Sequence, residues 1–179
     1  MNTERTPNVR GIYPRNNKTQ YWNYKNKKPK GAKSLMDKDV INELNAFLKG
    51  QYMGIHAYEN LIQNETDENI KKELQEIQKS HKVHAASVAE RIQNLGGRPV
   101  DDEGLLGSMQ ENIVRLMSTP KETHEILETA LKGEAHYGVK MSEEIVKGDL
   151  DQGSNLIIKQ ILDEDRTHVN TLNSLLQTQ

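Results

Sequence analysis

The chain has 179 residues and a formal net charge of -2; 34% of the residues are hydrophobic, 28% are charged and none is cysteine. The lack of cysteine excludes a disulfide framework, a thiolate metal site and a cysteine nucleophile. No apolar run reaches the roughly 18 residues of a membrane span, and the N-terminus lacks the apolar stretch of a signal peptide, so we expect a cytoplasmic protein with no membrane partner.

The first 36 residues are predicted to form a disordered basic tail. Residues 1–33 contain no leucine, and their nine lysines or arginines and one acid give a charge of +8, whereas the rest of the chain carries -10. Such a segment lacks the apolar surface needed to fold. Its lysines lie among Tyr21, Trp22 and Tyr24, a composition that suits binding to nucleic acid or to an acidic partner. A solubilising extension, or one that docks on an acidic bundle of its own or a neighbouring chain, fits the same composition.

Two long helices are predicted next, over residues 37–63 and 66–95. Apolar residues recur three and four positions apart in both, which is typical of helices with one buried face. Gly96-Gly97, followed by Pro99, ends the second helix. The link between the helices is short, so we expect an antiparallel hairpin. Its predicted seam comprises Val40, Leu44, Phe47, Leu48, Ile55 and Leu61 on the first helix, and Ile70, Leu74, Ile77, His81, His84, Val88, Ile92 and Leu95 on the second.

A second hairpin is predicted over residues 119–176. Its first helix begins at Thr119-Pro120 and ends at Gly148, because threonine can cap a helix and proline suits the first turn. Its second helix begins near Ser154. About 24 residues join the hairpins; a structureless loop of that length is uncommon, and a crossover along a four-helix bundle explains it. The seam comprises Leu127, Leu131, Glu134, Gly138, Met141 and Ile145, then Ile158, Ile161, Asp165, His168, Leu172 and Leu175.

The two hairpins, 37–95 and 119–176, look duplicated. Leu48-Lys49-Gly50-Gln51 recurs 83 residues later as Leu131-Lys132-Gly133-Glu134, and His81-x-x-His84 recurs 84 residues later as Asp165-x-x-His168. Matching offsets in two separate segments favour an internal repeat. The repeat predicts that Gln51 corresponds to Glu134, and His84 to His168.

Each predicted helix carries polar residues on its apolar seam near mid-length. Residues three apart on a helix share a face, so each such pair points inward together. Buried polar groups cost about 1–3 kcal/mol each unless they find partners. We therefore expect these side chains, called here the polar layer, to satisfy one another or to hold a metal ion. The polar layer comprises Gln51, His81, His84, Glu134, Asp165 and His168.

These motifs resemble the ferritin-like superfamily. The run from Glu68 to Ala85 is similar to the second helix of rubrerythrins, and Gln51 with Tyr58 resembles the first. Gly133-Glu134 resembles the third. The whole pattern is most similar to an uncharacterised bacterial ferritin-like family with a doubled hairpin. The resemblance covers about 140 residues and implies an all-α, antiparallel four-helix bundle with a long crossover between its second and third helices.

The resemblance also implies a metal site formed by the polar layer. Ferritin-like di-metal proteins place a Glu on two helices and Glu-x-x-His on the other two. Three positions depart from that pattern: Gln51, His81 and Asp165 each stand where a Glu is expected. Only two carboxylates remain, which disfavours a di-iron oxidoreductase, although three imidazoles and two carboxylates suit one ion such as iron or zinc.

Two functions remain open. The first is a metal-binding protein with a metal- or stress-related role. The second is a non-catalytic structural or interaction protein with a metal-free polar core that fixes the register of the helices. We expect no enzyme activity; if the chain is an enzyme, a di-iron-type oxidoreductase is the class implied. The candidate partners are other copies of the chain, and nucleic acid or an acidic partner at the tail.

Overall fold

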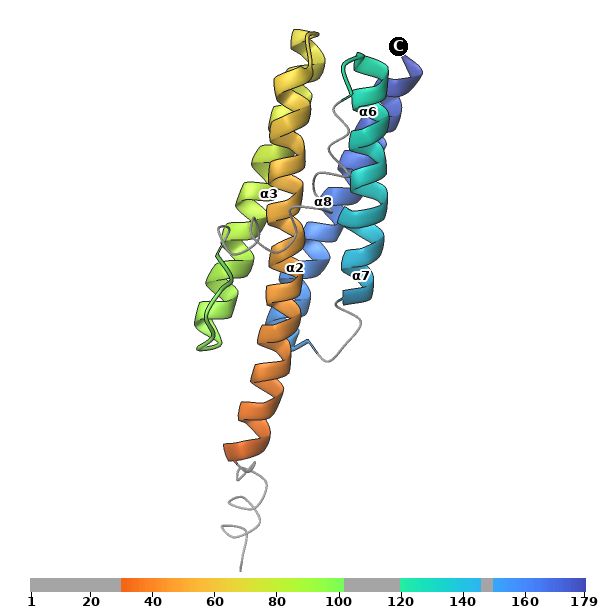
Figure 1. The fold of residues 1–179 in the computed structure, drawn as a ribbon. Helices are drawn as coiled ribbons and strands as arrows, with labels where there is room; N and C mark the ends of the chain where they lie inside the picture. The colour runs from red at the N-terminus through yellow and green to blue at the C-terminus, as the bar shows by residue number, and fades with distance from the viewer. Residues whose placement is uncertain (1–29, 102–119, 146–149) are drawn as a thin grey trace, which may run out of the picture. The chain divides into compact units, whose positions relative to one another are not determined.

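The computed structural model describes residues 30–101, 120–145 and 150–179. These residues are helical wherever they have regular secondary structure. The segments are α2 (Lys30–Asn64), α3 (Glu68–Asn94), α6 (Thr123–Lys132), the π-helix η1 (Gly133–Met141), α7 (Ser142–Ile145) and α8 (Gln152–Gln177). Because α6, η1 and α7 follow one another without a break, they form one long third helix. The predicted all-α four-helix bundle is thereby confirmed (Figure 1).

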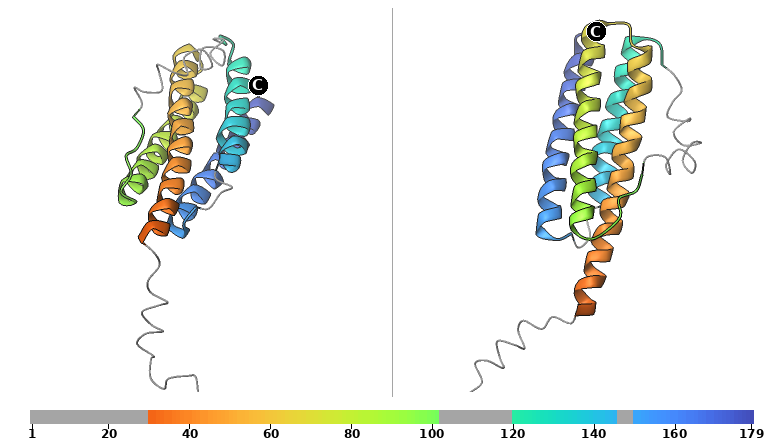
Figure 2. Two further views of the ribbon diagram at one scale, coloured as in Figure 1. Left: turned by 60° about the horizontal axis from the view of Figure 1, so that its bottom comes forward. Right: turned by 90° about the vertical axis from the view of Figure 1, so that its left-hand side faces the viewer.

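Residues Met36–Gln179 form one compact unit, which contains all of the bundle except the first turns of α2. Its α3 runs antiparallel to α2, and α8 runs antiparallel to the third helix (Figure 1). The end of α3 and the start of α6 lie at opposite ends of the bundle (Figure 2). The predicted crossover falls on residues 102–119, which lie outside the described part of the chain.

Short-range signals explain where several helices begin and end. The side chain of Asp67 accepts hydrogen bonds from the backbone N–H groups of Asn69 and Ile70 and so caps α3. Asp151 caps α8 in the same way. After α3, Gly96 has a φ of +80°, a backbone conformation that glycine adopts at little cost. The chain can therefore turn directly after the helix.

Some predicted boundaries differ from those in the structure. The tail prediction falls largely on residues 1–29, which lie outside the described residues, and α2 already begins at Lys30 rather than near Asp37. The third helix begins at Thr123 rather than Thr119, and Glu122 at its N-cap makes no side-chain capping bond. Capping residues mark a possible start of a helix, but tertiary packing decides how many residues join it.

The third helix contains a nine-residue π-helix that the sequence did not predict. Regular α-helical spacing was assumed from residue 119 to 148, whereas η1 makes wider turns from Gly133 to Met141. π-Helices are rare and are often found at functional sites. Here the π-helix carries Glu134, a member of the polar layer.

Among the residues that the structure describes, the core consists of two hydrophobic clusters. One contains ten buried side chains, from Val40, Leu44 and Phe47 on α2 to Leu162 on α8. The other contains nine, from Tyr58 on α2 to Leu172 on α8. Along α2, α3 and α8, the residues of the polar layer lie between those of the two clusters. Among the described residues, no helix is both long and apolar enough to cross a membrane.

Candidate metal centre

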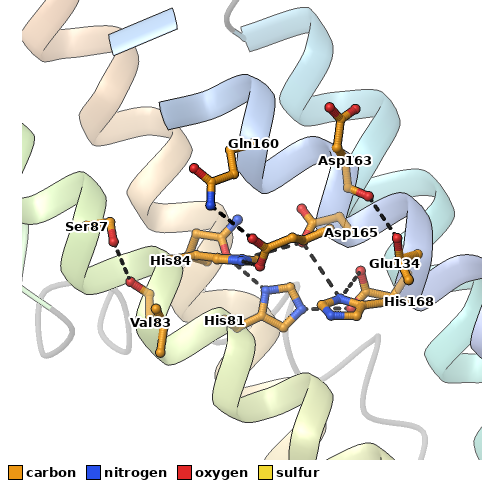
Figure 3. Close-up of polar contacts among 12 residues, drawn as sticks. His81, Val83, His84, Ser87, Glu134, Gln160, Asp163, Asp165 and His168 are labelled. Carbon is orange, nitrogen blue, oxygen red and sulfur yellow. Dashed lines mark hydrogen bonds and ion pairs between the residues drawn. The ribbon is translucent and has the colours of Figure 1, made fainter. Parts of the chain in front are cut away.

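The structure buries five of the six predicted polar-layer residues. Gln51, His81, His84, Glu134 and Asp165 are each at most 3% exposed. His168 is nearly as enclosed, with 13% of its side chain exposed. They come from α2, α3, η1 and α8, and Figure 3 draws His81, Glu134, Asp165 and His168 close to one another. The sequence therefore placed these side chains correctly, and their role as metal ligands remains a prediction.

His81 has hydrogen-bond partners at both ring nitrogens. Its Nε2–H donates to Glu134 Oε1 at 2.7 Å, since a carboxylate can only accept. Its Nδ1 lies 2.8 Å from Gln51 Oε1. One imidazole thus joins α2 to η1. It also bonds to both members of the pair that the predicted duplication relates, Gln51 and Glu134, and the duplication itself stays a prediction.

The atoms on the other side of the layer have no hydrogen-bond partner. These buried atoms are His84 Nδ1, Glu134 Oε2, both carboxylate oxygens of Asp165, and His168 Nδ1. Their separations exceed hydrogen-bond length: 3.5 Å from His84 Nδ1 to Asp165 Oδ1, 3.8 Å from His168 Nδ1 to Asp165 Oδ1, and 3.9 Å from His168 Nδ1 to Glu134 Oε2. Such unpaired buried groups are uncommon in folded proteins and require an explanation.

Four of these side chains form a compact group of potential ligands. His81, Glu134, Asp165 and His168 each offer a nitrogen or oxygen atom, and the four atoms all lie within 4.8 Å of one another. The group is buried and could hold a metal ion. His84 stands outside this group of four but contacts it through Asp165, and Gln51 contacts it through His81.

The two buried carboxylates have opposite electrostatic environments. Burial alone would raise the pKa of Glu134, but the neighbouring His168 and the hydrogen bond from His81 outweigh burial and lower that pKa to about 2. Burial raises the pKa of Asp165 to about 7, and the attraction of His81 offsets only part of this effect. Glu134 is therefore a stable anion, whereas Asp165 lacks the positive partner that would favour its ionised form.

The two histidines of α3 also differ. Burial lowers the pKa of His81, but its hydrogen bond to Glu134 outweighs burial and the net pKa is raised. The pKa of His84 is lowered, chiefly by burial. A hydrogen bond from His84 in turn lowers the pKa of Glu164, whose oxygen lies 2.8 Å from His84 Nε2. His81 therefore favours the charged form and His84 the neutral form.

Sequence reasoning missed Glu164. This residue directly precedes Asp165 on α8, and its side chain is 48% exposed. Because it lies off the apolar seam among many surface acids, its helical position predicts only solvent contact. The signal that could have found it is the buried His84 itself, since a buried imidazole needs a partner at each nitrogen.

Small and aromatic residues enclose the layer. The buried ring of Tyr58 lies 5.6 Å from that of His81, centroid to centroid, and burial raises the pKa of its phenol well above 10. A Cβ atom added at Gly54 would meet the His81 ring at 3.4 Å, an ordinary contact. One added at Gly138 would lie only 3.0 Å from Glu134 Oε2. Gly138 therefore provides the space that this unpartnered oxygen occupies.

Comparisons with known proteins place this chain in a family. Residues 39–148 match the family described as "Domain of unknown function (DUF2383)", and this is more than half of the chain, so the chain belongs to that family. A solved structure of similar fold is the bacterioferritin-related protein of Bacteroides fragilis, described as a dodecameric thioferritin. It is 21% identical, with a TM-score of 0.64 over 83% of this chain and 94% of that chain. At this identity the likeness shows the ferritin-like fold alone. No curated protein matches the chain in sequence.

Proposed function

We propose that this member of the DUF2383 family binds one divalent transition-metal ion in the polar layer, with Glu134, Asp165 and His168 at the core of the site. The observation that carries the proposal is the set of buried donor atoms without partners on these three residues. A buried carboxylate with no partner is strongly destabilising, because burial removes its hydration. A bound cation would supply the missing interactions at all three side chains.

The distances between these atoms suit a shared ion. Around a tetrahedral ion with ligand bonds of about 2.0–2.2 Å, neighbouring donor atoms lie about 3.4 Å apart. His168 Nδ1 lies 3.8 Å from Asp165 Oδ1 and 3.9 Å from Glu134 Oε2. These separations are too long for hydrogen bonds and close to those of atoms that share a metal. The donor set therefore fits a metal ion.

The chemistry of the donors narrows the class of ion. Imidazole nitrogen with carboxylate oxygen suits zinc or ferrous iron, whereas calcium and magnesium prefer oxygen alone. Two carboxylates cannot neutralise a pair of trivalent ions, so a single divalent ion fits better than a di-iron centre. A bound ion of this kind supplies a Lewis acid, and an iron ion adds redox chemistry. We place the protein among metal-binding proteins with a metal- or stress-related role.

The hydrogen bonds of His81 favour a second function, that of a structural bundle. Gln51, His81 and Glu134 satisfy one another without a metal, as a layer that fixes helix register would require. This function accounts for one side of the layer. It leaves the buried oxygens of Asp165 unexplained, and the metal-binding proposal accounts for both sides.

Elemental analysis tests the proposal. The protein would be purified without an affinity tag, loaded aerobically with iron or zinc, and freed of loose metal. We expect about one ion per chain and a higher melting temperature, because an ion at 100 times its Kd stabilises the folded state by about 2.7 kcal/mol. The Glu134→Gln variant should retain little metal. A wild-type protein with no bound metal and a metal-independent melting temperature would leave the structural function standing.

Two partner predictions complete the proposal. Homo-oligomerisation is suggested by the ferritin-like neighbour, which is described as a dodecamer, and sedimentation velocity would measure the assembly directly. Residues 1–29 of the predicted tail lie outside the described residues, and the contact of the tail with nucleic acid or an acidic partner stays a prediction. Deleting residues 1–33 should abolish any salt-sensitive DNA retardation. Equal retardation by both proteins would assign that binding to the bundle.

A further inference from the structure

We infer that Glu164, an exposed acid beside the polar layer, positions the imidazole of His84 so that its Nδ1 serves as a further donor to the bound ion. This inference rests on the metal binding proposed above and deepens it. It names a supporting residue outside the six polar-layer positions. It also separates the roles of the two histidines on α3, His81 and His84.

The hydrogen bond of Glu164 selects one tautomer of His84. His84 Nε2 lies 2.8 Å from Glu164 Oε2. A carboxylate can only accept, so the ring carries its proton on Nε2 and, when neutral, presents a lone pair on Nδ1. Metal-ligating histidines commonly donate their second ring N–H to a carboxylate, which fixes the ring and strengthens the ligand. Glu164 stands in that position relative to His84.

The lone pair of His84 points at the proposed site. His84 Nδ1 is buried, has no hydrogen-bond partner, and lies 3.5 Å from the equally unpartnered Asp165 Oδ1. Two acceptor atoms facing each other across this distance repel, and a cation between them would bind both. The separation is close to the roughly 3.4 Å between neighbouring ligands of a tetrahedral ion. In the close-up, the His84 ring lies next to Asp165 (Figure 3).

His81 cannot serve in the same way without losing a bond. Both of its nitrogens are engaged, Nδ1 with Gln51 and Nε2 with Glu134. An ion could take either nitrogen only by displacing one of those partners. His81 therefore holds the Glu134 carboxylate in place, and His84 supplies the donor. This division follows from the replacement of a carboxylate by His81 at a position where the ferritin-like pattern has Glu.

The setting of Glu164 argues for a positioning role over a stabilising one. Its side chain is 48% exposed, and its second oxygen accepts a hydrogen bond from Gln160 at 3.3 Å. Half-exposed ion pairs add little to the stability of a fold. Metal affinity is more sensitive than stability to such a residue, because changes in residues that support metal ligands typically weaken metal affinity 10–100-fold.

The test compares Glu164→Ala and Glu164→Gln with a matched control, Asp163→Ala. Asp163 is the adjacent exposed acid on α8 and pairs with Arg166, so the control removes a surface ion pair without touching His84. Zinc affinity would be measured by competition with a chelator. The His84 tautomer would be read in the metal-free protein by long-range proton–nitrogen NMR. Circular dichroism would verify that each variant is folded.

We expect Glu164→Ala to weaken zinc binding 10–100-fold and to convert His84 from the Nε2–H tautomer to a mixture. Glu164→Gln should recover part of the affinity, because its amide oxygen still accepts from Nε2–H. Asp163→Ala should change affinity less than about twofold. In the wild type, zinc should perturb the Nδ1 resonance of His84 most strongly.

Two results would overturn the inference, and they are distinguishable. If the wild type binds zinc and Glu164→Ala binds it equally well with an unchanged tautomer, the positioning role is wrong while the proposed function stands. If the wild type binds neither zinc nor ferrous iron, the proposed function is wrong and the inference fails with it.

Discussion

The two sides of the polar layer are buried to a similar depth but differ in how their polar atoms are satisfied. On one side, His81 bonds to Gln51 at 2.8 Å and to Glu134 at 2.7 Å. On the other, Asp165 is 0% exposed and neither of its oxygens has a hydrogen-bond partner. The first side stabilises the fold, since satisfied buried bonds contribute to it. We expect the second side to destabilise the metal-free fold, since buried polar groups without partners cost free energy.

The change Asp165→Asn should have the largest effect on metal affinity. It should also show most clearly that the two sides of the layer contribute differently to stability. It removes a ligand and a buried charge together. We expect metal affinity to fall more than 100-fold while the metal-free protein gains about 2–4 kcal/mol at pH 8, since each raised pKa unit corresponds to about 1.4 kcal/mol. Chelator competition and urea denaturation measure the two quantities. A destabilised metal-free variant would show that Asp165 has a partner in the fold.

The stability of the metal-free protein should depend on pH in different ways on the two sides of the polar layer. The pKa of Asp165 is about 7 in the fold against an ordinary 3.8, so the folded state binds the extra proton and stability falls as pH rises from about 4 to 7. The raised pKa of His81 acts in the same direction at higher pH, and the lowered pKa of His84 opposes it. Glu134, with a pKa of about 2 against 4.5, loses its contribution only as pH falls below about 4.5.

Urea denaturation across this pH range would measure the slope, which for one proton is at most about 1.4 kcal/mol per pH unit. Asp165→Asn should make the slope of the free energy of unfolding between pH 4 and 7 less negative. Asp163→Asn, a change at the exposed neighbour, should leave that slope unchanged. Identical profiles for wild type and Asp165→Asn would contradict the unpaired state of this carboxylate.

A change on the hydrogen-bonded side of the layer should have the opposite effects, lowering the stability of the metal-free protein and leaving metal affinity nearly unchanged. Gln51→Leu keeps the approximate volume of the side chain and leaves His81 Nδ1 without its partner. We expect the metal-free protein to lose about 1–3 kcal/mol, the usual cost of an unsatisfied buried group. Metal affinity should change only a few-fold, because the Gln51 side-chain oxygen is already engaged with His81 Nδ1. Loss of metal binding in a folded Gln51→Leu protein would extend the site to α2.

The smallest effect is expected at Gly138, where the π-helix leaves room for Glu134. An added Cβ would lie 3.0 Å from Glu134 Oε2, so Gly138→Ala should displace this oxygen by a few tenths of an ångström. We expect metal affinity to fall about 3–10-fold, or roughly 1 kcal/mol. Gly133→Ala is the matched control, because nothing lies within 4 Å of its added Cβ. Equal affinities for the two variants would remove Gly138 from the site.

Most of the fold was predictable because it follows from the spacing of apolar residues. Three- and four-residue steps identified the buried faces of α3 and α8, and both faces lie in the core. The polar layer was predictable for the same reason. Polar residues that interrupt an apolar seam, such as His81 or Asp165, must be buried if the seam is buried.

What could not be predicted depends on atomic positions across the bundle. The sequence treats His81 and His84 as an equivalent pair, but their partners come from different helices and are 30 to 80 positions away. The π-helix lacks a local signal that distinguishes it from an α-helix containing Gly133 and Gly138. Glu164 lies on an exposed face where its periodicity predicts solvent. Tertiary packing alone assigns these roles.

A crystal structure of the zinc- or iron-loaded protein, with anomalous diffraction recorded at the absorption edge of the metal, would locate the bound ion. We predict one anomalous peak per chain in the polar layer. That peak should be bonded to Asp165, His168 and Glu134, with His84 Nδ1 as the further ligand and His81 still hydrogen-bonded to Gln51. A loaded crystal with no peak in this layer, or with the ion bonded to His81 and away from Asp165, would contradict this prediction.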